Sequence, residues 1–278
     1  MNIVGLYGGS GFIGSHFQSM LTKISNDTEV FLLPHRKSNN EIKSALRKLD
    51  SINSKNVHKS ILYLGENNDI AKANKSGFEY IKKNTERLKF ILSNSKCRII
   101  YASSVAVYGD SSELIHHPED KVEATNTYTN SKLECEKLVL QADGIVARLS
   151  NIYGIGMSKK NIISDVLKQI NSKGVNSINI INGSPKRDLI HISDVTACLL
   201  AMTKIQEKGV YNVATGINIS MKDLTLMILE SSNLLDCKIE ESKHSKQTSC
   251  ISVDITKTKE TFNWSPYITL KDGLKELV

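Results

Sequence analysis

The sequence lacks long apolar runs: no segment approaches the roughly 20 residues that a membrane-spanning helix needs. The first predicted strand starts at residue 2 or 3, so we expect no signal peptide. The net charge is +7, but no block of five or six basic residues occurs, which gives nucleic-acid binding little support. A hydrophobic content of 40% is typical of a soluble globular protein, and the mild positive charge would attract a small anionic ligand.

Cysteines are few, and they form neither a C-x-x-C pair nor a cluster with histidine. This scatter argues against structural zinc, any other metal site, or a disulfide framework. We therefore expect reduced thiols, a cytoplasmic location and buried, mainly structural roles. The five positions are Cys97, Cys135, Cys198, Cys237 and Cys250.

Glycine, by contrast, is concentrated at the start of the chain, directly after an apolar run at residues 3–7. Its spacing fits both G-x-G-x-x-G and G-x-x-G-x-x-G, followed by apolar residues at helical spacing. Such a strand–turn–helix unit lets a diphosphate approach main-chain N–H groups at the positive end of a helix dipole. The stretch therefore predicts a dinucleotide cradle with contacts from Gly8, Gly11, Phe12, Ile13 and Gly14.

Strand-like and helix-like segments alternate along the rest of the first half. This alternation predicts an α/β fold, a Rossmann-type doubly wound parallel sheet. A polar stretch at 236–250 is interpreted as a surface connection. The predicted strands are 29–33, 61–65, 98–102 and 145–149, and the predicted helices are 41–50, 70–94 and 128–141.

The end of the second predicted strand bears on the choice of cofactor. In NAD-binding versions of this fold an acid there binds the ribose 2′-hydroxyl, whereas an arginine accommodates a 2′-phosphate. This chain has no acid there, and Arg36, Lys37 and Ser38 could form a phosphate pocket. NADP(H) is therefore favoured and NAD(H) remains possible, since Arg36 could instead stack on adenine or the turn could simply be solvated.

Three polar residues suggest proton-transfer chemistry. Tyr128 and Lys132 are spaced i, i+4 and so share one face of a predicted helix, and Ser104 closes the fourth predicted strand. An ammonium near a phenol stabilises the phenolate, and such a tyrosine can exchange a proton with a carbonyl or carbinol oxygen. Ser104 could hold that oxygen in place.

Together these motifs resemble the extended short-chain dehydrogenase/reductases, in the NAD-dependent epimerase/dehydratase branch that acts on nucleotide sugars. Residues 103–109, Ser-Ser-Val-Ala-Val-Tyr-Gly, are similar to the family's SSxxVYG, and Asn84 is similar to its helix asparagine near the active site. The resemblance implies that Ser104, Tyr128 and Lys132 are catalytic, with Tyr128 as acid/base and Lys132 also holding the cofactor ribose. Gly65, at the end of the third predicted strand, joins the predicted cofactor contacts, as do Tyr128 and Lys132.

Motifs of the second half extend the resemblance over nearly the whole chain. Residues 148–154 are similar to R-x-x-N-x-Y-G, and residues 187–195 to R-D-x-x-H-V-x-D-V. The resemblance implies that Asn151 and Arg187 bind the diphosphate of a nucleotide sugar, together with Ser104 at the sugar. Four other motif residues are interpreted as buried or capping residues that hold the small lobe together: Asp188, His191, Asp194 and Trp264.

The resemblance also implies a domain division and an assembly. Residues 1–150 would form the dinucleotide-binding domain and residues 151–278 mainly a smaller C-terminal substrate-binding lobe, with segments near 190–215 returning to the first domain. A homodimer through a four-helix interface is expected, with no nucleic-acid or membrane partner.

Two residues reduce the number of reactions that the resemblance allows. The family's 4,6-dehydratases carry an Asp-Glu pair where this chain has Val105 and Ala106, so a dehydratase is rejected. A 4-ketoreductase of a 4-keto-6-deoxy sugar nucleotide that uses NADPH is favoured by the basic turn and the short chain, and an NAD-dependent 4-epimerase is the alternative. A non-catalytic dinucleotide-binding sensor or scaffold and a reductase of a small or flavonoid-like ketone remain open.

Overall fold

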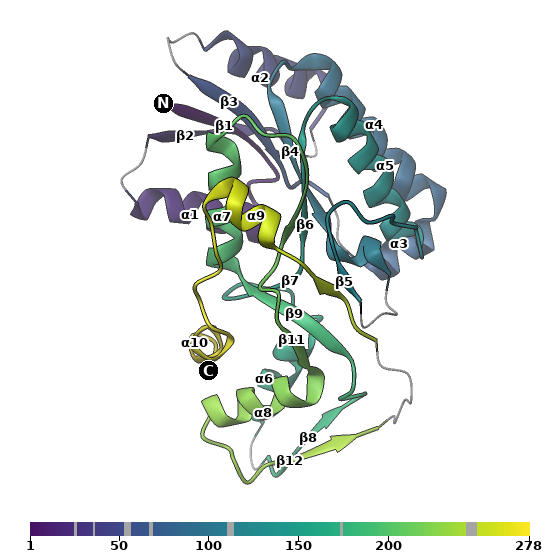
Figure 1. Ribbon diagram of the computed structural model, residues 1–278, viewed down its shortest axis with the longest axis vertical. Helices are drawn as coiled ribbons and strands as arrows, with labels where there is room; N and C mark the ends of the chain where they lie inside the picture. The colour runs from purple at the N-terminus through teal and green to yellow at the C-terminus, as the bar shows by residue number, and fades with distance from the viewer. Residues whose placement is uncertain are drawn as a thin grey trace.

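A six-stranded, all-parallel sheet forms the centre of the molecule (Figure 1), in the order β2-β1-β3-β4-β6-β10. The computed structural model describes residues 1–24, 27–35, 37–52, 57–66, 69–109, 114–172, 175–242 and 249–278. The predicted Rossmann-type sheet is confirmed. Its strands are β1 Asn2–Tyr7, β2 Thr28–Leu33, β3 His58–Tyr63, β4 Arg98–Ser104, β6 Ile145–Leu149 and β10 Gly209–Val213.

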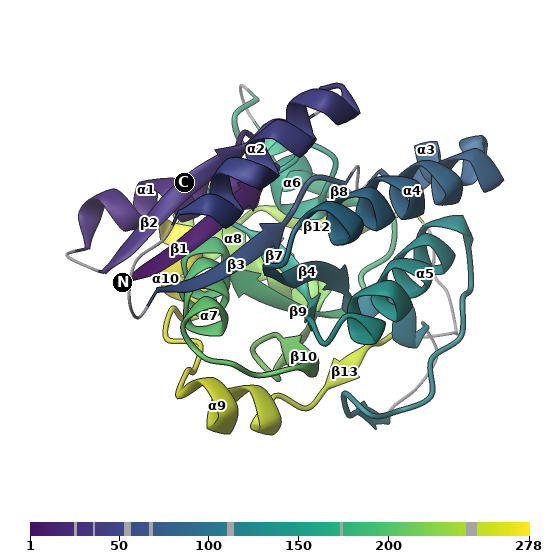
Figure 2. The same cartoon turned by 90° about the horizontal axis from the view of Figure 1, so that it is seen from above.

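Helices cover both faces of this sheet (Figures 1 and 2). On one face, α1 and α7 pack on apolar residues of β1, β4 and β6, and on the other, α2, α4 and α5 cover a second apolar cluster. Both faces of each inner strand are therefore buried, as a parallel sheet requires. The helices are α1 Phe12–Lys23, α2 Asn39–Ser51, α4 Phe78–Asn94, α5 Thr127–Gln141 and α7 Ile192–Lys204.

The strand order reverses at β1, which lies between β2 and β3. The chain leaves β1 toward β2 and returns on the other side to form β3. Connections that diverge in this way leave a crevice at the carboxyl ends of the strands, where open α/β sheets bind ligands. The glycine-rich stretch follows β1 directly and so lies at this point.

The second half of the chain adds a smaller lobe, in the lower part of Figure 1, with its own apolar cluster. In it, β9 pairs with β7 and β11, and β8 pairs in parallel with β12. Its strands are β7 Asn151–Tyr153, β8 Ser177–Ile180, β9 Lys186–His191, β11 Asn218–Ser220 and β12 Lys238–Glu241, and its helices are α6 Ile162–Ile170, α8 Met221–Ser231 and α10 Leu270–Lys275.

Two late segments return to the large sheet. After β9 the chain forms α7 and β10, and after β13 (Ser252–Val253), which pairs with β5 (Ile115–His116), it forms α9 (Thr256–Phe262). Phe262 and Trp264 pack in the cluster beside α1 and α7. The domain division at residue 150 stays a prediction, but residues 256–264 lie with the large sheet.

Two sequence predictions need correction. The helix predicted over 70–94 is two helices, α3 (Ile70–Ser76) and α4, because Gly77 between them has a φ of +52°, in the region that favours glycine. The stretch 236–250 is not only a connection, since β12 pairs with β8 within it; residues 243–248 lie outside the described residues.

Candidate active site

The loop after β1 is so tight that two of its positions require glycine. Gly8 has a φ of +95°, and the Gly11 N–H donates to its carbonyl oxygen at 3.0 Å. A Cβ on Gly14 would lie 2.5 Å from the Gly8 oxygen and 2.7 Å from the Gly9 Cα, so α1 packs directly on the loop. Gly11 is the N-cap of α1, with no side-chain cap and no acidic residue in the first turn. The helix start, with half-buried Phe12 and Ile13, therefore presents main-chain N–H groups and a positive dipole end.

Gly65 forms the opposite wall of this loop. A Cβ on Gly8 would come within 2.7 Å of the Gly65 nitrogen, and a Cβ on Gly65 would lie 2.3 Å from the Tyr7 ring. The Gly65 carbonyl oxygen is hydrogen-bonded to His35 Nε2 at 2.9 Å, which ties the end of β2 to the end of β3. The chain thus lines the crevice with the backbones of four glycines, Gly8, Gly11, Gly14 and Gly65, an arrangement that fits a dinucleotide diphosphate.

The basic turn after β2 is only partly described. Arg36 lies outside the described residues, and Lys37 is exposed. Ser38 has a different role from the predicted phosphate contact: it is the N-cap of α2, accepts from the Glu41 N–H at 3.3 Å and donates its hydroxyl to Glu41 at 2.8 Å. These bonds hold the pKa of the Glu41 carboxyl below its ordinary value.

The three predicted catalytic residues come from β4 and α5, which pack against each other. Ser104 ends β4 and is the N-cap of the short helix η1 (Val105–Tyr108), with its hydroxyl accepting from the Ala106 N–H at 3.2 Å. Tyr128 lies in the first turn of α5, 6% exposed. The Lys132 ammonium is 2.9 Å from the Ala102 carbonyl oxygen on β4 and 5.7 Å from the centre of the Tyr128 ring. All three therefore lie at the carboxyl end of β4.

A carboxylate that the sequence analysis missed lies at the same place. Glu66 Oε2 accepts from the Lys132 ammonium at 2.8 Å, and both side chains are almost fully buried. Burial lowers the pKa of Lys132, but the neighbouring Glu66 outweighs this, so the pKa lies above its ordinary value. No local motif indicated this contact, because the two residues are 66 positions apart in sequence.

Asn84, the asparagine that the family resemblance placed near the active site, lies next to the Glu66–Lys132 pair. Asn84 on α4 donates to the hydroxyl of Ser131 on α5 at 3.0 Å and so fixes the two helices next to Lys132. Tyr80, one turn earlier on α4, is half-buried, and burial raises its pKa to about 12. Asn84 therefore contacts the helix that carries Tyr128 and Lys132.

Asn151 and Arg187, the two predicted diphosphate contacts, lie on neighbouring strands of the small lobe. Asn151 on β7 is exposed and donates to the Asp188 carbonyl oxygen at 3.1 Å. Arg187 on β9 donates to the Ser249 carbonyl oxygen at 3.0 Å and to the Ser249 hydroxyl at 2.6 Å. Both side chains are thus oriented by contacts within the protein.

The motif residues interpreted as structural do make structural contacts. Asp188 accepts from Ser150 and from the turn at 215–217, and burial raises its pKa. His191 is the N-cap of α7. Asp194 accepts from two backbone N–H groups at 267–268, and Trp264 donates to its carbonyl oxygen. The last two join the C-terminal segment to α7, rather than holding the small lobe alone.

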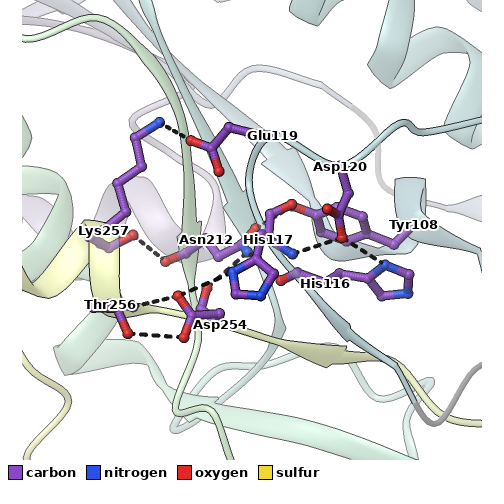
Figure 3. Close-up of polar contacts among 10 residues, drawn as sticks. Tyr108, His116, His117, Glu119, Asp120, Asn212, Asp254, Thr256 and Lys257 are labelled. Atoms are coloured by element: carbon purple, nitrogen blue, oxygen red, sulfur yellow. Dashed lines mark hydrogen bonds and ion pairs between the residues drawn. The ribbon is translucent and has the colours of Figure 1, made fainter.

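A second polar group, also missed from the sequence, joins η1, β5 and the segment after β13 (Figure 3). Tyr108 donates to Asn212 at 2.7 Å and stacks on His116, whose ring lies 3.5 Å from Asp120. His117 lies 3.7 Å from Asp254. This group fastens the C-terminal segment beside the helix that follows Ser104.

One cavity of the molecule lies apart from this site. It has a volume of about 470 Å³ and lies between α1 and α7, and none of the three predicted catalytic residues lines it.

Among the described residues no group of three His, Cys, Asp or Glu side chains is arranged to hold a metal ion. No helix in the described ranges has the length and apolar character to cross a bilayer. All five cysteines are free.

The fold and the glycine-lined crevice define a dinucleotide-binding α/β protein with a Ser-Tyr-Lys group at one strand end. Residues 4–214 match the model of the NAD dependent epimerase/dehydratase family. The chain belongs to this family, which confirms the resemblance drawn from its motifs and the expectation that the protein is an enzyme.

Individual relatives cover most of the chain. A Methanocaldococcus jannaschii protein assigned as a UDP-glucose 4-epimerase is 27% identical over 98% of this chain and 95% of its own length. The dTDP-4-dehydro-6-deoxyglucose reductase of Escherichia coli is 24% identical over 86% of this chain and 79% of its own. The structure of RMD from Pseudomonas aeruginosa complexed with NADPH superposes with a TM-score of 0.86 at 22% identity, covering 100% of this chain and 97% of that one.

Proposed function

We propose that this protein is an NADPH-dependent reductase of a nucleotide-linked keto sugar, most specifically a 4-keto-6-deoxy sugar nucleotide. The observation that carries this proposal is the placement of Ser104, Tyr128 and Lys132 together at the carboxyl end of β4. That strand lies next to β3, whose end forms one wall of the glycine-lined crevice. Family membership supports a nicotinamide dinucleotide as cofactor.

In this proposal the crevice residues bind and orient the cofactor. Gly8, Gly11 and Gly14 allow a diphosphate to approach the start of α1, flanked by Phe12 and Ile13, and Gly65 closes the opposite side. The bound cofactor supplies the hydride. Lys132, whose ammonium donates to the Ala102 carbonyl oxygen and to Glu66, is assigned to hold the cofactor ribose.

Proton transfer is assigned to the protein. Tyr128 donates a proton to the sugar carbonyl oxygen as that oxygen gains negative charge, and Ser104 hydrogen-bonds the same oxygen. The Ser104 hydroxyl donates its hydrogen there while its oxygen keeps the Ala106 N–H contact. Val105 and Ala106 provide no carboxyl group for the elimination of water, which supports a reductase or epimerase over a dehydratase.

Sugar-nucleotide binding is assigned to the small lobe. Arg187 has a guanidinium that Ser249 fixes from one side, and a fixed guanidinium fork suits phosphate oxygens. Asn151 lies on the neighbouring strand. Residues 151–278, apart from the segments that return to the large sheet, are proposed as the substrate lobe, within a cytoplasmic homodimer.

The preference for NADPH rests on the end of β2, which has no acidic residue in the described positions up to Ser38 and carries exposed Lys37. Arg36, outside the described residues, would add a second charge for a 2′-phosphate. Among similar structures, the Pseudomonas structure holds NADPH and others hold NAD, which supports a nicotinamide dinucleotide of either kind. The alternative, an NAD-dependent 4-epimerase, is favoured by the Methanocaldococcus relative, which aligns over nearly its whole length.

Mass spectrometry of the purified protein separates these two functions. A reductase is expected to purify without a dinucleotide and to oxidise added NADPH in the presence of a 4-keto sugar nucleotide. Co-purified NAD at one equivalent, with interconversion of sugar epimers and no net NADPH oxidation, would instead establish the epimerase. Absence of turnover with any UDP-, dTDP-, GDP- or CDP-sugar would support a non-catalytic role.

The assignment of Tyr128 is tested by Tyr128→Phe. Loss of a general acid costs about 100-fold to 10,000-fold in rate, so turnover is expected to fall by at least about 100-fold. Affinity for NADPH, measured by fluorescence titration, is expected to change little because Tyr128 is one of ten proposed cofactor contacts and the glycine-lined crevice is unaltered. Turnover equal to that of the unaltered protein would refute the assignment.

A further inference from the structure

Glu66 makes contacts beside the proposed site, but the reaction described above gives it no role. It follows Gly65 at the carboxyl end of β3, and its side chain is 4% exposed. Its Oε2 atom lies 2.8 Å from the Lys132 ammonium. Both of its oxygens also accept from the hydroxyl of Tyr101 on β4, each at 2.9 Å. The carboxylate is therefore held in one orientation by two neighbouring elements.

Lys132 is fixed from three sides as a result. Besides Glu66, its ammonium donates to the Ala102 carbonyl oxygen and lies 4.9 Å from the centre of the Tyr101 ring, within range of a cation–π contact. Its side chain is 3% exposed. An ammonium buried to this degree without a counter-ion costs free energy, and Glu66 supplies that counter-ion.

The tyrosines and the cysteine that surround this pair are uncharged near neutral pH. Burial raises the pKa of Tyr63, Tyr101 and Cys135 well above ordinary values, and Tyr80 follows the same trend. Arg87 also faces the Tyr63 side of the group. Glu66 is thus the carboxylate in direct contact with the ammonium that lies beside Tyr128, and it balances that charge.

We propose that Glu66 is a positioning residue of the reaction: it holds the Lys132 ammonium beside Tyr128 and balances its charge. The inference rests on the proposed function, in which Tyr128 donates a proton. An unbalanced ammonium would stabilise negative charge on a neighbouring phenol oxygen more strongly than a balanced one does. Glu66 therefore sets the net charge beside the proposed proton donor without touching substrate.

The test compares Glu66→Gln with the unaltered protein in the pH dependence of kcat. The amide keeps the size of the side chain but removes its charge, so Lys132 is left unbalanced next to Tyr128. The basic limb of the profile is expected to move to lower pH by about one unit, a tenfold change in the protonated fraction. An unmoved limb, or one that moves to higher pH, would overturn the proposal.

Glu134→Gln is the matched control, since Glu134 forms an exposed ion pair with Lys137 on α5 and is not assigned to the site. It is expected to leave the limb in place. If Glu66→Gln does not fold, Glu66→Asp carries the test. It keeps the charge but draws the carboxylate back, so kcat is expected to fall about tenfold with the limb unmoved. An unchanged kcat in Glu66→Asp would overturn the positioning role.

Failure of this proposal can be told apart from failure of the proposed function. If Tyr128→Phe is inactive while Glu66→Gln keeps the kcat profile and the NADPH dissociation constant of the unaltered protein, only the role of Glu66 is refuted. If Tyr128→Phe is fully active, the proposed function is refuted and the role of Glu66 with it.

Discussion

Two buried ion pairs fix the residues around β4, the strand that ends at Ser104. One is Glu66 with Lys132, and the other is Glu136 with Arg148, whose guanidinium donates to both Glu136 oxygens at 3.2 and 2.8 Å. Ser103, next to Ser104, donates to the same carboxylate, and Arg148 stacks on the Tyr108 ring at 4.8 Å. The second pair therefore joins α5, β4, β6 and η1 directly behind the proposed site.

Glu136→Ala tests how far the fold depends on this second pair. The change leaves Arg148 buried without a counter-ion, and breaking a buried pair in this way costs about 3–5 kcal/mol. Chemical denaturation is expected to show a loss of that size. Glu134→Ala, two residues earlier in an exposed pair, is expected to cost less than about 1 kcal/mol. Equal losses in the two variants would contradict this interpretation.

At the level of single residues, sequence alone indicates Ser104, Tyr128 and Lys132 because motif spacing and family resemblance agree on them. It does not indicate Glu66 or His35. Their partners are distant in sequence, 66 positions for Lys132 and 30 for Gly65, and only the sheet register brings them together. Ser38 shows the converse: its local pattern suits a phosphate contact, but a capping box with Glu41 uses its hydroxyl.

Among the elements, the β1–α1 unit leaves the least room for an added side chain. The start of α1 lies so close to the preceding loop that Gly14 has no room for a side chain. In Gly14→Ala, overpacking of about 1–3 kcal/mol would outweigh the roughly 1 kcal/mol that alanine gains over glycine in a helix. We expect lower thermal stability and weaker NADPH binding.

Gly11→Ala provides the graded comparison for this prediction. Its added Cβ would lie 3.3 Å from the Gly8 oxygen, a contact that a small shift relieves. Its unfolding temperature is expected to fall less than that of Gly14→Ala. The reverse order would show that the close approach of α1 to the loop is not what requires glycine at residue 14.

The start of α7 gives a pH dependence of stability. His191 caps this helix through Nδ1, which accepts from the Ser193 N–H at 3.3 Å, and burial holds its pKa below the ordinary value of 6.5, although Glu276 opposes the shift. A lowered pKa means that the neutral ring stabilises the fold above about pH 6.5, and this contribution is lost as the pH falls through the folded-state value.

His191→Asn tests that contribution, since asparagine is a good N-cap and does not titrate. In the unaltered protein the unfolding temperature is expected to fall between pH 7 and pH 5.5. The variant is expected to show a smaller fall over the same range, measured by circular dichroism. A slope equal to that of the unaltered protein would assign the pH dependence to other groups.

Elements with a clear pattern of apolar residues were predictable from the sequence. Elements that depend on hydrogen bonds to distant segments were not. The strand at 145–149 matches β6 residue for residue because it is a short apolar run between turn signals. The break at Gly77 was missed because the apolar pattern continues on both sides of it. Strand β12 was missed because it is polar and gains its hydrogen bonds from β8, about 60 residues earlier.

At the scale of the whole molecule, the large sheet supplies the dinucleotide crevice and the small lobe carries Asn151 and Arg187. The chain passes between them at β6–β7, at β9–α7 and after β10, returns to the large sheet with α9 and ends in the small lobe with α10. Sequence alternation predicted the sheet, and the family resemblance predicted the return near 190–215. The packing of residues 256–264 on the large sheet was not predicted. The sequence around Phe262 and Trp264 does not indicate which distant residues they contact.

The proposed homodimer belongs to this scale too. The α4 positions Lys82, Lys83, Glu86 and Lys89 are exposed, so an interface through α4 and α5 would bring charged side chains together. Sedimentation at several salt concentrations tests it. A dimer that forms through these helices is expected to change its dissociation constant with salt, and a single monomeric species at all concentrations would contradict the dimer.

Transfer of a labelled hydride tests the central claim most directly. The protein is incubated with a 4-keto-6-deoxy sugar nucleotide and NADPH that carries deuterium at both C4 positions, and the product is analysed by mass spectrometry. The proposed reductase predicts one deuterium in the sugar for each NADPH oxidised, and loss of this transfer in Tyr128→Phe. A reduced sugar without deuterium, or undiminished transfer by Tyr128→Phe, would contradict the proposed chemistry.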